Sequence, residues 1–350
     1  MEDISVNNQG RVKLKSLSFA DLEDYIVSLG EKKFRAKQVF EWMHRGVRTF
    51  DEMANVPKGL REKLSDCADL EALSVERIQV SKKDGTRKYL LKLGDGALVE
   101  SVLMKYSYGN TVCISSQAGC RMGCAFCASC ENGLDRGLTA GEILDQVLAV
   151  SRDIGQKVDN VVVMGVGEPF DNYDSVTGFI DNVHDPRGFG LSQRSITVST
   201  CGIVPKIREF GRNYPQVTLA VSLHAPDEET RSQLMPINRK YSFDVLLEAC
   251  RDYTRNTNKR ITFEYILLGG LNDRRSDAIK LAEALRGILC HINLIPFNGV
   301  EGKPYTPATR KKAEEFLGEL KARGIEATIR RELGSDIDGA CGQLRSRSKK

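Results

Sequence analysis

The sequence predicts an α/β protein whose main part is an open, partial (β/α)6-type barrel, preceded by a small N-terminal helical accessory domain and a β-hairpin connector. From Thr111 onward, short runs rich in Val and Ile alternate with stretches whose apolar residues recur every three or four positions. That alternation is typical of parallel strands joined by helices. About six or seven such strands are too few for an eight-stranded closed barrel, so we expect an open one with its site at the strands' carboxyl ends.

The N-terminal part is predicted to be helical. Residues 1–16 form a flexible lead-in, and residues 17–72 hold three short amphipathic segments, LSFADLEDYIVSL, RAKQVFEWMHRGV and LREKLSDCA. Basic residues gather here beside Phe34, Phe40 and Trp42: Lys32, Lys33, Arg35, Lys37, Arg45 and Arg48. They are either a solvated helix face or an RNA-binding patch, and charge alone does not decide between the two.

The connector and the barrel follow. Residues 73–110 contain β-rich runs separated by Asp84-Gly85, Gly94-Asp95-Gly96 and Gly109-Asn110, which indicate hairpin turns. Residues 111–345 form the barrel, and residues 346–350 a short basic tail.

Composition places this 350-residue chain among soluble globular proteins of the cytoplasm. Its hydrophobic fraction of 41% can fill a core, and no run approaches the ~20 apolar residues of a membrane helix. The first residues, MEDISVNNQG, have neither the basic nor the apolar region of a signal peptide. The net charge of +4 is too balanced to prove a polyanionic partner. Ten cysteines in a reducing compartment favour metal-binding or catalytic thiols over disulfides.

Three of these cysteines are closely spaced: Cys120, Cys124 and Cys127 form a Cys-x3-Cys-x2-Cys motif. A 4Fe–4S cluster normally takes four thiolates, so three protein ligands leave one iron open to a small molecule. This spacing resembles that of the radical S-adenosylmethionine (SAM) superfamily, in which the open iron binds the amino and carboxylate groups of SAM. A structural zinc site is the alternative, with Cys113 or Cys130 as the fourth ligand.

Polar or glycine-rich residues stand where predicted strands end. Gly167 and Glu168 follow NVVVMG, and a glycine-rich turn lets backbone approach a ligand while Glu168 can accept a hydrogen bond from an ammonium group. Ser199 ends SITVST, and Ser222, Leu223 and His224 follow VTLAV. Asn298 follows HINLIPF. Each alone is typical of a strand cap, but four such turns at matching barrel positions indicate a polar ligand.

Two outlying thiols complete the candidates. Cys113 lies on the strand before the cysteine motif, and Cys341 lies in the glycine-flanked stretch SDIDGACGQL, which we expect to be flexible enough to enter a site. Cys67, Cys250 and Cys290 fall in apolar patterns and are interpreted as packing residues. The roles of Cys130 and Cys201 stay open.

Taken together, the motifs identify a family resemblance. The segments CISSQ, GCRMGCAFC, LTAGEI, VVVMGVGEP, LSQRSITVSTCGIVPKI, LAVSLHAP, LMPINRKY, ITFEYILLGGLND, HINLIPFN and DIDGACGQL resemble the RlmN/Cfr family of radical SAM RNA methyltransferases over residues 18–345. The wording FEYILLGGLND and LIPFN leans towards the RlmN branch. Departures are Gly339 in place of the usual alanine, the extra thiols Cys130 and Cys201, and the absence of a proline after Asn298.

The resemblance implies methylation of carbon 2 of adenine in the peptidyl-transferase region of 23S rRNA and in tRNA. It implies one 4Fe–4S cluster on Cys120, Cys124 and Cys127, and two SAM molecules per turnover. Cys341 would take a methyl group from the first SAM, and a radical from the second would activate that methyl group for addition to adenine. Cys113 would resolve the protein–RNA adduct through a transient disulfide with Cys341. The adenine proton would go to Glu100 or to Cys113.

The same resemblance assigns the SAM contacts to the strand-end residues Gly167, Glu168, Ser199, Ser222, Leu223, His224 and Asn298. It implies a monomer in the cytoplasm, with no membrane partner, reduced by a donor such as flavodoxin or ferredoxin. Two alternatives stay open: Cfr-like methylation of another carbon of the same rRNA adenine, and a non-catalytic, zinc-stabilised RNA-binding module.

Overall fold

A ten-stranded sheet organises the chain. The structure, a computed structural model, describes residues 6–7, 9–300, 302–339 and 342–344. The strand order is β14-β13-β12-β11-β10-β9-β6-β5-β4-β3, and all pairings from β6 to β14 are parallel. The parallel strands are β6 (Gly109–Ile114), β9 (Asn160–Val163), β10 (Ile196–Thr200), β11 (Thr218–Ser222), β12 (Ile261–Leu267), β13 (Cys290–Pro296) and β14 (Ala327–Ile329).

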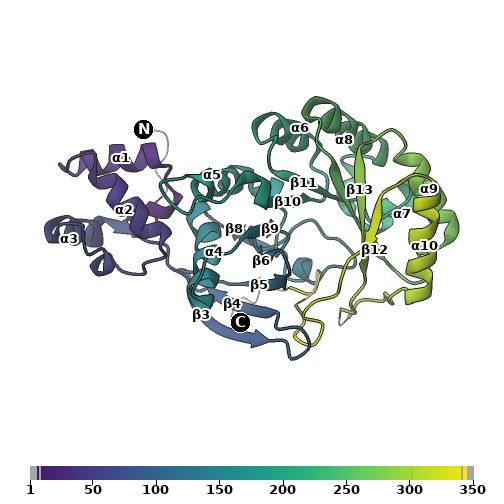
Figure 1. Cartoon of the computed structure of the whole chain (residues 1–350), viewed down its shortest axis with the longest axis horizontal. Coiled ribbons are helices and arrows are strands. Elements are labelled where there is room, and N and C mark those ends of the chain that lie inside the picture. The colour runs from purple at the N-terminus through teal and green to yellow at the C-terminus, as the bar shows by residue number, and fades with distance from the viewer. Residues whose placement is uncertain (1–5, 8, 301, 340–341, 345–350) are drawn as a thin grey trace.

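Helices connect these parallel strands. The connecting helices cover the parallel strands. Apolar residues of the strands and of the facing sides of the helices therefore pack into one core. Figure 1 shows α6, α8, α9 and α10 on the outside of the curved sheet. Since β6 and β14 do not pair, the barrel is open, and the predicted fold class is confirmed. The helices are α4 (Ala140–Ile154), α5 (Tyr173–His184), α6 (Val204–Asn213), α7 (Glu228–Leu234), α8 (Phe243–Thr257), α9 (Arg275–Ala284) and α10 (Arg310–Ala322), with 3-10 turns η3 (Ala128–Cys130), η4 (Pro169–Asn172), η5 (Gln193–Ser195) and η6 (Pro236–Arg239).

The antiparallel strands extend the barrel sheet and are not a separate layer. β3 (Ser74–Val80), β4 (Arg87–Lys92) and β5 (Leu98–Tyr106) form a meander that ends on β6. β6 pairs antiparallel with β5 on one side and parallel with β9 on the other. The hairpin region predicted from its turns therefore leads directly into the first barrel strand.

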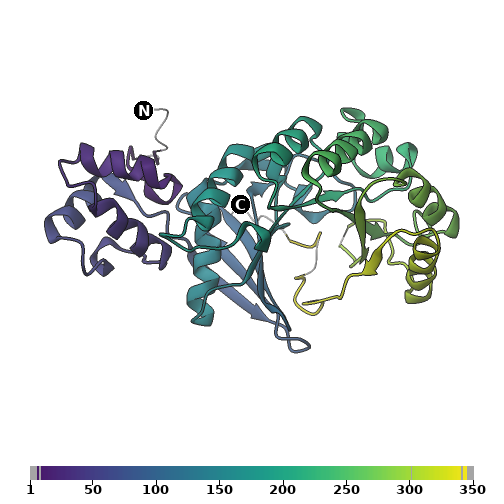
Figure 2. The same cartoon turned by 45° about the horizontal axis from the view of Figure 1, so that its top comes forward.

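The N-terminal helices form a unit with its own core at the end of the molecule opposite α10 (Figure 2). A buried ion pair fixes this unit to the barrel: Lys15 Nζ lies 2.5 Å from Asp145 Oδ1 of α4. Asn182 of α5 also donates to the carbonyl oxygens of Lys15 and Leu17. The elements are β1 (Val12–Lys13), η1 (Leu14–Ser16), α1 (Phe19–Ser28), α2 (Arg35–His44), η2 (Phe50–Glu52), α3 (Lys58–Cys67) and β2 (Ala68–Asp69). None of the helices in the described residues combines the length and apolar character that a bilayer crossing requires.

Candidate active site

A short two-stranded clamp holds the cysteine loop. β7 (Gln117–Gly119) pairs antiparallel with β8 (Leu134–Gly137), and the Cys120 amide donates to the carbonyl oxygen of Gly133 at 2.8 Å. Gly119 has a φ of +79°, and a Cβ there would lie 2.1 Å from the Gly133 oxygen, so only glycine fits. Farther along, Ala125 donates to the carbonyl oxygen of Leu234 at 2.9 Å, which ties the loop to the end of α7.

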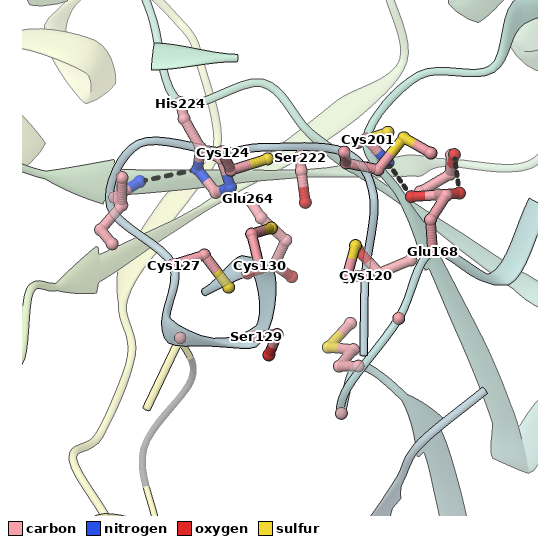
Figure 3. A pocket seen from close by; sticks show the side chains of 18 of the residues that line it. Cys120, Cys124, Cys127, Ser129, Cys130, Glu168, Cys201, Ser222, His224 and Glu264 are labelled. Atoms are coloured by element: carbon pink, nitrogen blue, oxygen red, sulfur yellow. Dashed lines mark hydrogen bonds between the residues drawn. The ribbon is translucent and has the colours of Figure 1, made fainter. Parts of the chain in front are cut away.

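The loop places four thiols in one cavity at the carboxyl ends of the parallel strands (Figure 3). We call it the thiol cavity. Its lining also includes most of the residues expected from the strand ends, and we find there Gly167, Glu168, Ser199, Ser222 and His224 beside Cys120, Cys124, Cys127 and Cys130. Sequence patterns thus predicted residues that the fold brings together from four separate segments.

The thiol of Cys130 lies between those of Cys120, Cys124 and Cys127 (Figure 3). Interaction with the Cys130 thiol and burial raise the pKa of Cys120, Cys124 and Cys127, while interaction with these three thiols lowers the pKa of Cys130. Within the described residues, no group of three or more His, Cys, Asp or Glu side chains is arranged around a single metal ion.

Glu168 is completely buried at the edge of the thiol cavity, where Gly167 has a φ of +109°. Its Oε1 accepts from the Phe170 amide at 3.0 Å and the Thr200 hydroxyl at 2.7 Å, and its Oε2 accepts from the Cys201 amide at 2.7 Å. Burial raises the pKa of Glu168, and these bonds partly offset the rise. The Cys201 side chain also interacts with this carboxyl group, which lines the thiol cavity.

His224 is held in an unusual backbone conformation, with a φ of +56°. Its Nδ1 accepts from the Ile266 amide at 3.1 Å, and the Phe126 ring packs edge-on against it at 4.9 Å. Burial lowers the pKa of His224 to about 3, so the ring is neutral at physiological pH. Leu223 is buried in the main core and contributes only its backbone, whose amide donates to the Glu264 carbonyl oxygen at 3.0 Å.

Cys113 and Asn298 line a second hollow next to the thiol cavity. We call it the Cys113 hollow; Met164, Ile295, Arg330 and Leu344 line both spaces. Cys113 is buried on β6, directly opposite Val102 of β5. Five of the seven expected SAM contacts thus line the thiol cavity. Asn298 instead lines the Cys113 hollow, and Leu223 is buried in the core.

Glu100 lies on β5, buried, and is absent from the described lining of both spaces. Its Oε1 is 3.5 Å from Lys88 Nζ. The same ammonium group donates to the carbonyl oxygen of Asp338 at 3.2 Å. Lys88 therefore links Glu100 to the segment that immediately precedes Cys341.

Cys341 itself lies outside the described residues. Its described neighbours are close to the site: Gly339 lines the Cys113 hollow, and Gly342 lines the thiol cavity. The Gly342 carbonyl oxygen accepts from the Ala128 amide at 2.9 Å.

Sequence reasoning missed three charged residues at the site. Glu264 on β12 lines the thiol cavity; its Oε2 accepts from Asn293 at 2.9 Å and lies 4.0 Å from Arg330 Nη1. Burial raises the pKa of Glu264. Arg231 is buried beneath the strand ends and donates to the Cys201 carbonyl oxygen at 2.6 Å. An acidic residue inside the apolar run ITFEYILL was the available signal for Glu264, since Glu is almost never fully buried without a function or partner.

The chain is similar to known proteins over almost its whole length. Residues 12–70 match the ribosomal RNA large subunit methyltransferase N-terminal domain, and residues 114–282 match the radical SAM superfamily. A probable dual-specificity RNA methyltransferase RlmN from Desulforamulus reducens is 50% identical over 342 residues, which is 97% of this chain and 98% of the relative. One from Lachnospira eligens is 51% identical over 335 residues, covering 95% and 96%.

A solved structure agrees with this relationship. The crystal structure of a radical SAM methyltransferase from Sphaerobacter thermophilus superimposes with a TM-score of 0.91 at 44% identity, covering 95% of this chain and 98% of that one. Membership of the radical SAM superfamily implies a 4Fe–4S cluster and SAM. The predicted family is confirmed: the chain belongs to the RlmN family of radical SAM RNA methyltransferases.

Proposed function

We propose that this enzyme methylates carbon 2 of an adenine in the peptidyl-transferase region of 23S rRNA and in tRNA. Family membership and the name of its relatives, probable dual-specificity RNA methyltransferase RlmN, support this assignment. Carbon 2 lies between two ring nitrogens and is electrophilic, so it cannot attack the methyl group of SAM as a nucleophile. The enzyme therefore needs radical chemistry and a protein group that carries the methyl carbon.

Cys120, Cys124 and Cys127 hold the cluster in this proposal. The donor set fits: the thiols converge from one clamped loop, and sulfur is the ligand that iron–sulfur clusters take. The cluster would supply the electron that reduces SAM and starts the radical reaction. Two SAM molecules are used per turnover, one as methyl donor and one as radical source.

The strand ends bind SAM next to these thiols. Glu168 places a carboxyl group in the cavity for the ammonium group of SAM, and Ser199 and Ser222 offer hydroxyl groups in the same cavity. In neutral His224 the Nδ1 accepts from the Ile266 amide, so Nε2 carries the proton and can donate one hydrogen bond without adding positive charge beside the sulfonium. Asn298, at the Cys113 hollow, would contact the part of SAM that reaches towards the RNA base.

The observation that carries the proposal is the position of the residues around Cys341. Gly342 borders the thiol cavity, and Gly339 borders the hollow that contains Cys113. The described neighbours of Cys341 on either side therefore border both spaces, which is what the chain of a methyl carrier requires. Cys341 would take the methyl group from SAM by direct displacement, with its thiolate as the nucleophile.

Cys113 completes the reaction. After the methylene carbon on Cys341 has bonded to adenine carbon 2, the adduct would return one electron to the oxidised cluster and lose the carbon 2 proton to a protein base. The Cys113 thiolate then attacks the Cys341 sulfur, and a disulfide forms as the carbon–sulfur bond breaks. The electron pair of that bond stays on the methylene carbon, which takes a proton to become the methyl group. The methylated base leaves, and an external reductant restores both thiols. Glu100 and Cys113 are the two candidates for the base that removes the carbon 2 proton. The link from Glu100 through Lys88 to Asp338 favours Glu100, because it ties that carboxylate to the Cys341 segment.

The remaining assignments follow from this chemistry. The helical unit of residues 17–72 would hold the folded RNA, and a flavodoxin or ferredoxin would deliver electrons. We propose that the enzyme works as a monomer in the cytoplasm, where its RNA substrates are. The base must be in a loop or leave its stack to reach a buried site.

Mass spectrometry of the Cys341 peptide tests the proposal. Protein purified without oxygen from cells should carry a methyl group on Cys341, and Cys341→Ala should abolish methylation of RNA. Cys113→Ala should instead accumulate a covalent protein–RNA adduct. Cys67→Ser, a thiol of the N-terminal unit, is the control and should behave like the parent.

Contrary results would identify the alternatives. An unmethylated Cys341 in protein with a complete cluster and SAM would overturn the mechanism. Nucleoside analysis showing a methyl group on another carbon of adenine would indicate Cfr-like specificity. A colourless protein that retains zinc and does not cleave SAM would be a binding module.

A further inference from the structure

Cys130 is a fourth thiol in the thiol cavity that the proposed reaction does not use. Together with the three proposed cluster ligands it gives the spacing Cys-x3-Cys-x2-Cys-x2-Cys. All four thiols line the thiol cavity, and the Cys130 sulfur lies between those of the other three (Figure 3). Cys130 is therefore next to any group that Cys120, Cys124 and Cys127 hold in common.

The backbone keeps Cys130 at this place. It ends the turn η3, where the Glu131 amide donates to the Ala128 carbonyl oxygen at 3.2 Å and the Gly133 amide to the Cys130 carbonyl oxygen at 3.3 Å. Ser129, one residue earlier, donates to the Leu344 carbonyl oxygen at 2.8 Å. A change of side-chain rotamer can move the sulfur aside, but moving it away from the cavity would break these bonds.

A 4Fe–4S cluster that fills the space between the three other thiols must displace the Cys130 sulfur and then contacts its side chain. Such a cluster normally takes four thiolates, and three protein ligands leave one iron without one. We propose that Cys130 is an exchangeable fourth ligand of the cluster, which binds the open iron until SAM replaces it. This inference rests on the proposed cluster at Cys120, Cys124 and Cys127.

The exchange is a ligand substitution without electron transfer. When Cys130 binds, its thiol releases a proton to solvent and a sulfur–iron bond forms. When SAM binds, its amino nitrogen and carboxylate take that iron, the sulfur–iron bond breaks, and the thiolate takes a proton from solvent. The iron oxidation states stay the same throughout.

Two consequences follow for the resting enzyme. The fourth iron is the one that three-cysteine clusters lose most easily, and a thiolate on it protects the cluster while SAM is absent. SAM must also compete with Cys130, so the apparent affinity for SAM is lower than that of a variant without this thiol.

The test compares the parent with Cys130→Ala and Cys130→Ser, each assembled anaerobically with a cluster of Mössbauer-active iron. In the SAM-free parent all four irons should have thiolate-type parameters, whereas in both variants one iron should differ. Adding SAM should make the three spectra alike. Cys201→Ala is the matched control, because Cys201 is also a buried extra thiol in the lining of the thiol cavity.

Two further readouts use the same proteins. Brief oxidation without SAM should give a several-fold larger three-iron signal by electron paramagnetic resonance in the Cys130 variants than in the parent and in Cys201→Ala. SAM should bind several-fold more tightly to the Cys130 variants. A distinct fourth iron in the SAM-free parent, or equal oxidation of parent and Cys130 variants, would overturn the inference and leave the proposed function intact. A parent that assembles no iron–sulfur cluster would overturn both.

Discussion

The hydroxyl group of Ser129 donates to the carbonyl oxygen of Leu344 at 2.8 Å, across 215 residues of sequence. Ser129 follows the proposed cluster ligand Cys127 by two residues, and Leu344 follows the proposed methyl carrier Cys341 by three. The adjacent bond from the Ala128 amide to the Gly342 carbonyl oxygen runs in the same direction. The cysteine loop thus holds the segment after Cys341 in place through two hydrogen bonds.

Ser129→Ala should therefore uncouple SAM cleavage from RNA methylation. Loss of one buried hydrogen bond of about 0.5–1.5 kcal/mol lowers the occupancy of the docked segment by up to about tenfold. RNA methylation per SAM cleaved should fall, while cleavage without RNA persists. Ser151→Ala is the control, since the Ser151 hydroxyl group is buried and makes no hydrogen bond within the described residues. An unchanged ratio of methylated RNA to cleaved SAM in Ser129→Ala would show that this bond does not position the carrier.

Glu264→Gln should weaken SAM binding. Glu264 places a buried carboxyl group in the thiol cavity, and an acidic group there can receive hydrogen bonds from SAM or face its positive charge. Gln keeps the size and the bond from Asn293 but loses the charge, so we expect a dissociation constant raised by about tenfold, or about 1.4 kcal/mol. Anaerobic equilibrium dialysis measures it.

The control for this change is Glu283→Gln, an exposed residue of α9. Equal SAM affinities for all three proteins would mean that Glu264 serves only to hold Asn293 and Arg330 in place.

The barrel and most of the site could be predicted from the sequence because both depend on local pattern. Strand and helix periods differ, and the carboxyl ends of parallel strands meet at one edge, so the order of the segments was enough to place Glu168, Ser199 and Ser222 together. The bond from Ser129 to Leu344 and the ion pair of Lys15 with Asp145 could not be predicted, because each joins distant segments whose approach is set by packing. The thiol of Cys130 was visible in the sequence, but its contact with all three other thiols depends on the fold of the loop.

Glu71 should make stability fall as pH rises. Its carboxyl group is fully buried between Ser16 and Thr139, the N-cap residue of α4, and burial raises its pKa from 4.5 to about 7. Between pH 4.5 and about pH 7, the Glu71 carboxyl group loses its proton in the unfolded chain but keeps it in the folded chain. The stabilisation that neutral Glu71 gives the folded protein is therefore fully present below about pH 4.5 and is lost as pH rises through about 7. The free energy of unfolding should fall by roughly 3 kcal/mol over this range.

Urea unfolding at several pH values across this window measures the effect. Glu71→Gln removes the titrating group and keeps an acceptor for Thr139, so its free energy of unfolding should depend less on pH than that of the parent. Glu62→Gln, on the exposed side of α3, should keep the pH dependence of the parent. Curves for Glu71→Gln and the parent that stay parallel from acid to neutral pH would contradict a raised pKa for Glu71.

Arg35 decides between the two interpretations of the basic N-terminal helices. Its guanidinium lies 4.6 Å from the centroid of the Phe34 ring, which is 55% exposed, so the pair forms a cationic and aromatic surface at the start of α2. Lys33 is paired with Glu23 at 3.1 Å, whereas Arg35 makes no ion pair with a carboxylate in the part of the chain that the structure describes. Arg35 is therefore one of the residues of this group that can contact an RNA phosphate.

If the helices bind RNA, Arg35→Gln should weaken tRNA binding and reduce the slope of log K against log salt concentration by about one, because one fewer phosphate is neutralised. Lys311→Gln on the exposed face of α10 removes the same charge far from this surface and should leave the slope unchanged. Filter binding over a range of salt concentrations measures both. Equal slopes for the parent and both variants would mean that Arg35 belongs to an ordinary solvated helix face and that the RNA is held elsewhere.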